Sequence, residues 1–277
     1  MKTLAFVFSY NRPETLRACL DSISYNSDFI PDEGHIIDDC SPDPEVKKVI
    51  HESGITFKTG SYVFKDTNRG LGDSAQMALK RAREANPDFV FFIEGDYVFR
   101  RHGLDCVLDC LTNTPEGDSC LGIAGYDHPN QRDPLYIDHI FPSCMKAQVG
   151  EDNVNRAALH KPRMVEGLFN YSLELVSNTC WTSYLHWANI MKVAAEFPEL
   201  HDMLDHACAP RANHKYGYLP KYQAQRTVDD GMLSHALSLC WNRYAIKHGI
   251  DRERFGAWLN IRPSVAEHRF EGGTNFS

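Results

Sequence analysis

The chain has 277 residues, of which 43% are hydrophobic and 24% charged, and a formal net charge of −8. These values exclude a disordered chain and argue against a strongly basic nucleic-acid-binding protein, although local basic patches remain compatible with them. No stretch approaches the run of about 18 apolar residues that a membrane helix requires, so no membrane span is expected. Nine cysteines without a C-x-x-C pair indicate reduced thiols and a cytoplasmic setting, rather than a disulfide framework or a zinc site.

The first hundred residues alternate between strand and helix patterns. Apolar runs predict four strands, at 4–9, 35–39, 55–64 and 89–93. Helical periodicity predicts a helix in each interval, over 13–26, over 43–53, and from a cap at Asp73 or Ser74 to Ala85. This alternation is typical of an α/β fold that has a mostly parallel central sheet with helices on both faces.

The rest of the chain has a less regular pattern. We expect strands over 120–125 and 171–181, and helices over 103–111, 183–196, 198–208 and 229–248. Residues 127–163 and 209–225 are loop-like, and long loops inside a compact protein often cover an active site.

Two carboxylates follow the most apolar predicted strand. Residues 87–99 read PDFVFFIEGDYVF, which places Glu94 and Asp96 at the carboxyl end of a strand buried on both faces. Alternate residues of an extended chain point the same way, and Gly95 between the two acids allows backbone or ligand to approach closely. Two converging carboxylates suit Mg²⁺ or Mn²⁺ carried on a phosphate. The alternative is a strand that simply ends in a polar turn.

This acidic motif is the last of four that stand at predicted strand ends or at the start of a helix. In chain order they are Phe8-Ser9-Tyr10-Asn11-Arg12-Pro13, Asp38-Asp39-Cys40-Ser41, Asn68-Arg69-Gly70-Leu71-Gly72 and Glu94-Gly95-Asp96. In order and placement they resemble the nucleotide-sugar half of the GT-A-fold inverting glycosyltransferases of family 2. The resemblance covers roughly residues 3–100 and implies a GT-A (nucleotide-diphospho-sugar transferase) fold.

The resemblance also implies which residues bind the sugar donor. Asp39 would accept hydrogen bonds from the base or ribose of the nucleotide, and Arg69 could reach the diphosphate. The implied donor-binding residues are Ser9, Tyr10, Arg12, Asp38, Asp39, Asn68, Arg69, Gly70, Glu94 and Gly95. Ser9 and Tyr10 would flank the base, the latter by stacking, and Asp38 would support its neighbour. Without the resemblance, these residues are ordinary turn and capping residues.

A divalent metal ion, Mn²⁺ or Mg²⁺, is the implied cofactor. Asp96 would bind it directly. Glu94 departs from the Asp-x-Asp pattern of the family by one methylene group, which leaves its direct ligation open. His268, in the sequence Glu267-His268-Arg269-Phe270, is the candidate for a further ligand late in the chain, and the alternative is an ordinary surface or packed histidine.

The family places a general base in an acidic pair that opens a helix. Here residues 228–233 read VDDGML, which puts Asp230 in the position of the base, with Asp229 as the fallback. Two acids at a helix N-terminus are also ordinary capping residues that complement the helix dipole. Gly231 beside the pair departs from the family pattern.

The sequence therefore predicts a metal-dependent glycosyltransferase that moves a sugar from a nucleoside diphosphate sugar, most simply a UDP-sugar, to an acceptor hydroxyl with inversion. Residues 1–110 would form the nucleotide-sugar half, and residues 111–277 the acceptor half of the same continuous domain. The partner would be a soluble acceptor: a glycan, a protein, a small molecule or a hydroxylated base in DNA. A non-catalytic nucleotide-sugar-binding module is the alternative from another class. The sequence does not predict an oligomeric state.

Overall fold

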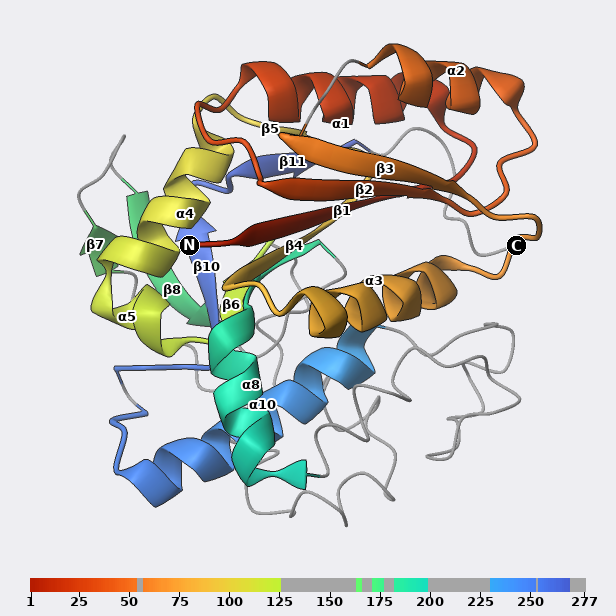
Figure 1. The fold of residues 1–277 in the computed structure, drawn as a ribbon. Helices are drawn as coiled ribbons and strands as arrows, with labels where there is room; N and C mark the ends of the chain where they lie inside the picture. The colour runs from red at the N-terminus through yellow and green to blue at the C-terminus, as the bar shows by residue number, and fades with distance from the viewer. Residues whose placement is uncertain are drawn as a thin grey trace.

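One large sheet organises the chain. A computed structural model describes residues 1–53, 57–125, 163–165, 171–176, 182–198, 230–252 and 254–269. Within these ranges nine strands form a sheet in the order β3-β2-β1-β4-β9-β6-β10-β8-β7, and β11 pairs with β5 in a second, small sheet (Figure 1). The strands are β1 (Thr3–Ser9), β2 (Glu33–Asp38), β3 (Thr59–Phe64), β4 (Phe89–Glu94), β5 (Tyr97–Phe99), β6 (Gly122–Ala124), β7 (Arg163–Val165), β8 (Tyr171–Val176), β9 (Ser183–His186), β10 (Trp258–Arg262) and β11 (Ala266–His268).

The large sheet is mostly parallel in direction. Strands β3, β2, β1 and β4 pair in parallel with one another, as do β6 and β10. Strand β9 is antiparallel to both of its neighbours, and so is β8, which leaves the other seven strands running the same way. The sheet contains strands from both sides of residue 110, so one sheet joins the two halves of the chain.

Helices cover both faces of this sheet, as the sequence predicts. Helices α1 and α2 lie on one face, and α3, α8 and α10 lie on the other (Figure 1). Side chains of β1 alternate between the two cores: Leu4 and Phe6 join the core under α3, while Ala5 and Val7 join the core under α1. The helices are α1 (Pro13–Tyr25), α2 (Pro44–Glu52), α3 (Leu71–Ala85), α4 (Gly103–Asn113), α5 (Pro115–Ser119), α8 (Trp187–Glu196) and α10 (Asp230–His248).

Two predictions about local structure are wrong. Helix α3 begins at Leu71 with Gly70 at its N-cap, so neither Asp73 nor Ser74 is the cap. Residues 183–186, predicted as the start of a helix, form β9 instead, because this segment pairs with β4 on one side and β6 on the other. The predicted loops over 127–163 and 209–225 lie almost wholly outside the described residues, as does nearly all of the predicted helix 198–208.

Strands β5, β7, β10 and β11 are absent from the sequence-based prediction. Each is short, and β5, β10 and β11 gain their backbone partners from segments far away in the chain: β11 pairs with β5 across more than 160 residues. Such pairing leaves little local signal. In the part of the chain that the structure describes, no helix is both long and apolar enough to cross a membrane.

The buried histidine at the end of β9 predicts a pH dependence of stability. His186 is 7% exposed, and burial lowers the pKa of its imidazole from the ordinary value of 6.5. A lowered pKa means that the folded chain disfavours the charged imidazole. The folded state therefore has its full stability above pH 6.5, where the imidazole is neutral in both states, and it loses stability as the pH falls below this value. Burial lowers the pKa of His35 too, although Glu33 opposes the shift. We expect the melting temperature to fall between about pH 7.5 and about pH 5.5.

His186→Phe, which keeps a ring against Phe89, should reduce that fall, whereas the exposed His51→Gln should not change it. Melting curves across this pH range would measure the effect. An unchanged pH dependence in H186F would contradict the assignment to His186.

Candidate active site

The register of the parallel strands brings three of the four motifs to one edge of the sheet. Ser9, the last residue of β1, stands opposite Asp38, the last residue of β2. On the other side of β1, Phe8 stands opposite Glu94, the last residue of β4, and the Gly95 amide donates to the Phe8 carbonyl over 2.8 Å. The side chains that follow these strand ends therefore share one region, at the carboxyl edge where open α/β sheets bind ligands.

Asp38 holds the turn that follows β2. Its side chain is fully buried, and its two oxygens accept hydrogen bonds from the Ser41 amide, at 2.9 Å, and the Ser41 hydroxyl, at 2.5 Å. The same hydroxyl accepts a hydrogen bond from the Asn11 amide over 2.8 Å. Asp38 therefore links the turn after β2 to the loop after β1 and supports the residue that follows it.

That residue, Asp39, joins the second motif to the third. Its Oδ1 accepts from the Arg69 amide at 3.0 Å, and its Oδ2 from the Gly70 amide at 2.6 Å. Lys65, which sequence reasoning missed, places its ammonium group 2.5 Å from Asp39 Oδ1. The side chains of both ionic partners are less than a tenth exposed. Asp39 is thus a buried carboxylate oriented by three donors.

Three loops of this region each contain a residue with a left-handed backbone. Asn11 has φ of 50°, Cys40 has φ of 60° and Gly70 has φ of 87°. Asparagine tolerates this conformation better than most residues, and glycine adopts it freely, whereas it is unfavourable for cysteine. Backbone strain of this kind tends to gather at ligand-binding sites, where the surrounding structure holds it in place.

Asp96 is the second acidic centre of the region. Its Oδ2 lies 2.8 Å from Arg12 Nη1 and 3.1 Å from His268 Nε2. Its Oδ1 is buried and accepts no hydrogen bond from any residue that the structure describes. A buried carboxylate oxygen without a partner is costly unless a further ligand completes it.

The small sheet explains how a residue near the end of the chain reaches Asp96. In the pairing of β11 with β5, His268 stands opposite Tyr97, and the two rings stack at 4.7 Å. The Arg269 amide also donates to the Asp96 carbonyl over 2.9 Å. The structure therefore brings His268 and Asp96 together as the resemblance implies, and the Asp96 carboxylate and the His268 imidazole are the described groups that fit a divalent ion here.

Glu94 is held differently from Asp96. Thr182, another residue missed from the sequence, donates its hydroxyl to Glu94 Oε2 at 3.2 Å and accepts from the Glu94 amide at 3.1 Å. The glycine between the acids serves packing: a Cβ on Gly95 would stand 2.9 Å from the Phe8 carbonyl oxygen. Gly95 thus lets the backbone of β1 approach closely, which is one of the two roles, approach of backbone or of ligand, that the sequence suggests for this glycine.

A cysteine lies under the acidic motif. Cys19 of α1 is fully buried, and its thiol lies 3.8 Å from the Glu94 carbonyl. Burial, followed by the negative charge of Asp96, raises the pKa of this thiol well above its ordinary value. Cys19 therefore stays neutral and does not compete with Asp96 for a cation.

The other predicted residues differ in placement. Ser9 is buried, and its hydroxyl has no hydrogen-bond partner in the described ranges, while Tyr10 is 40% exposed beside it. Arg69 is exposed with its Nε donating to Thr67 at 3.3 Å, and Asn68 is half-buried. Asp230 is the first residue of α10, but its side chain lies outside the described residues, as does the whole of Asp229.

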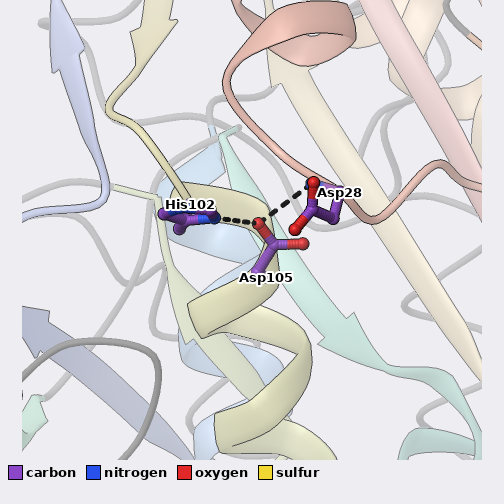
Figure 2. Close-up of side chains that lie close together, drawn as sticks. All are labelled: Asp28, His102 and Asp105. Carbon is purple, nitrogen blue, oxygen red and sulfur yellow. Dashed lines mark hydrogen bonds and ion pairs between the residues drawn. The ribbon is translucent and has the colours of Figure 1, made fainter.

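A separate group of possible metal ligands lies away from the strand ends. Ligand atoms of Asp28, His102 and Asp105 lie within 4.8 Å of one another (Figure 2). Asp105 is already engaged, because its carboxylate accepts the amides of Asp28 and Phe29 at 3.1 and 2.7 Å and faces His102 Nδ1 at 3.1 Å. Helix α1, about 20 Å long, separates this group from the motif after β1. The group of Asp28, His102 and Asp105 stabilises the turn after α1, and it is distinct from the strand-end site.

The mostly parallel sheet, with helices on both faces and acids at the carboxyl ends of its strands, is the architecture of a GT-A fold. Residues 5–167 match the model of the family described as "Glycosyl transferase family 2", which is more than half of the chain, and the chain belongs to that family. The family and fold predicted from the sequence are confirmed. No curated protein sequence matches the chain.

Solved structures similar to this chain are distant from it. TarS from S. aureus is 18% identical with a TM-score of 0.45, over 79% of this chain and 36% of that chain. Glucosyl-3-phosphoglycerate synthase from Mycobacterium tuberculosis, solved with Mn²⁺, UDP and glucosyl-3-phosphoglycerate, is 13% identical with a TM-score of 0.48, over 98% and 73%. Mannosyltransferase PcManGT from Pyrobaculum calidifontis, solved with GDP-Man and Mn²⁺, is 16% identical with a TM-score of 0.43, over 94% and 56%. The chain spans about a third of the full TarS chain and 59% of its 1–349 form.

The buried ion pair at Asp39 predicts a measurable effect on stability. Asp39→Asn removes one of the two negative charges that face Lys65, the other being that of Asp73, and should cost about 1–3 kcal/mol. Lys58→Met removes an exposed pair with Asp32 and should cost less than about 1 kcal/mol. Urea unfolding of the two variants would measure the difference. Equal, small losses would contradict the account of Asp39 as a buried, oriented carboxylate.

Proposed function

We propose that the chain is a metal-dependent glycosyltransferase that moves a sugar from a nucleoside diphosphate sugar, of the UDP class, to an acceptor hydroxyl with inversion. The observation that carries this proposal is the pair of acidic centres at one edge of the sheet: an oriented Asp39 and an Asp96 with one buried oxygen left without a described partner. One such centre would accept a hydrogen bond from the nucleoside, and the other would hold the metal ion of the diphosphate.

The nucleoside would bind at the ends of β1 and β2. Asp39 would accept a hydrogen bond from the base or ribose, and the exposed ring of Tyr10 offers a stacking surface. The hydroxyl of Ser9, which has no hydrogen-bond partner among the described residues, would bond to the nucleoside, since the Asp39 amide donates to the carbonyl of the same Ser9 over 2.9 Å. Arg69 is exposed beside Gly70 at the start of α3, where its guanidinium and the helix N-terminus would favour a diphosphate.

Asp96 Oδ1 and His268 would hold Mn²⁺ or Mg²⁺ together with the donor diphosphate, and Glu94 would act from beside them. An imidazole in the ligand set favours Mn²⁺ over Mg²⁺, which prefers oxygen ligands. When bound, the ion would offset the charge that develops on the departing diphosphate. Arg12 Nη1 lies 2.8 Å from Asp96 Oδ2, which would leave Oδ1 for the ion.

Inversion requires a base that takes the proton from the acceptor hydroxyl as this oxygen attacks the anomeric carbon. We propose Asp230, at the start of α10, for this role, with Asp229 as the fallback. Residues 1–110 would bind the donor, and residues 111–277 would bind the acceptor, which would be a glycan, a protein, a small molecule or a hydroxylated base in DNA. A cytoplasmic location stays a prediction from the cysteine pattern.

The donor class can be tested by thermal melting. We expect the melting temperature to rise with UDP and Mn²⁺ together, because a ligand at about 100 times its dissociation constant adds about 2.7 kcal/mol of stability. The rise should disappear with a chelator and in Asp96→Ala, and should be smaller with GDP, ADP or CDP. No rise with any nucleotide, for a chain that melts cooperatively, would contradict the proposed function.

The base assignment can be tested by comparing two neighbouring acids. Asp230→Asn should lower kcat by a factor of about a hundred or more while leaving the affinity for UDP and Mn²⁺ unchanged, because the base acts only in the chemical step. Asp229→Asn is the matched control and should retain most of the activity. Donor hydrolysis, or transfer to an identified acceptor, supplies the assay. The opposite ranking of the two variants would give the role to Asp229.

A further inference from the structure

The lysine beside Asp39 uses all of its hydrogen-bonding capacity inside the protein. The Lys65 ammonium lies 2.5 Å from Asp39 Oδ1 and 2.8 Å from Asp73 Oδ2, and it donates to the Ser74 hydroxyl over 3.2 Å. An ammonium group has three N–H donors, so none is left for a ligand. The side chain is only 8% exposed, and a buried ammonium is tolerated only when it is paired in this way.

This arrangement limits what Asp39 can still accept. Each carboxylate oxygen has two lone pairs. Oδ1 already accepts from Lys65 and from the Arg69 amide, whereas Oδ2 accepts from the Gly70 amide alone among the described residues. One acceptor position therefore remains, and it lies on Oδ2. Asp39 can receive a single N–H or O–H of a ligand, but it cannot receive a pair of adjacent N–H donors on both oxygens.

We propose that Lys65 is a specificity-determining residue that acts through Asp39 and selects against guanine. Guanine presents adjacent N–H donors on one edge, which would match a carboxylate with both oxygens available, whereas uracil presents a single imide N–H. Lys65 occupies Oδ1 and leaves only the single position. Rejection arises because a buried donor of the ligand without an acceptor is costly. This inference rests on the proposed nucleotide site and adds the origin of its base preference.

Lys65 also connects the base-binding carboxylate to the start of α3. Asp73 lies in the first turn of α3, and Ser74 follows it. Lys65 follows β3, Asp39 follows β2, and Asp73 lies in α3. The ammonium therefore holds the ends of the two strands against the first turn of the helix. A purely structural role would follow from these contacts as well, so the test must separate base selection from general support of the fold.

The test uses Lys65→Met, which keeps the aliphatic stem and removes the ammonium, with Lys58→Met as a matched control on an exposed ion pair. Titration calorimetry in Mn²⁺ gives the dissociation constants of UDP, GDP and inorganic pyrophosphate. We expect the unsubstituted chain to prefer UDP over GDP by about tenfold or more, and K65M to reduce this ratio severalfold as Oδ1 becomes available. The affinity for pyrophosphate should be equal in K65M and the unsubstituted chain. K58M should bind all three ligands as the unsubstituted chain does.

Lys65→Arg keeps the charge but not the compact ammonium, so its ratio of UDP to GDP affinity should lie between those of the unsubstituted chain and K65M. This variant provides the measurement if K65M does not fold. An unchanged ratio of UDP to GDP affinity, or equal losses for all three ligands, would overturn the role of Lys65 while leaving the nucleotide site intact. Absence of nucleotide binding in the unsubstituted chain would instead overturn the proposed function, and with it this inference.

Discussion

The parallel pairing of β1 with β2 and β4 is the constraint on which the rest of the site depends. Because the three strands point the same way and are in register, their last residues lie side by side. Motifs separated by about thirty to ninety residues in the chain thereby become neighbours. Gly95 is part of this constraint, since a side chain there would crowd the Phe8 carbonyl and move the end of β4 away from β1.

Each acidic centre of the site faces its own basic side chains, but the two environments differ. Asp39 faces Lys65 in a buried environment and receives backbone amides from the third motif, so its orientation is fixed by the fold. Asp96 faces Arg12 and His268 with side chains that are 16–25% exposed, so solvent and ligands reach its surroundings more easily. A rigid centre suits recognition of a base, and a more open centre suits an ion that arrives with its diphosphate.

The sequence predicts the first four strands of the sheet, and the acids at their ends, because their signals are local. A continuous apolar run such as that of β4 identifies a buried strand, and the polar residues after it identify the ligand edge. Lys65, Thr182 and the pairing of β11 with β5 leave no such signal, since each acts on a partner that the fold brings close from elsewhere in the chain. His268 could be found only through the family resemblance, because a single histidine has no pattern of its own. The cap of α3 differs from the prediction because Gly70 begins the helix without a side-chain hydrogen bond, whereas the sequence signal used for caps is a polar side chain.

The most direct test of the account is the position of Mn²⁺ in a crystal grown with UDP, located by its anomalous scattering. The account predicts one strong peak against Asp96 Oδ1 and His268, with the uracil ring at Asp39. A peak at Asp28, His102 and Asp105, with none beside Asp96, would contradict the central claim that the acids at the strand ends form the donor site.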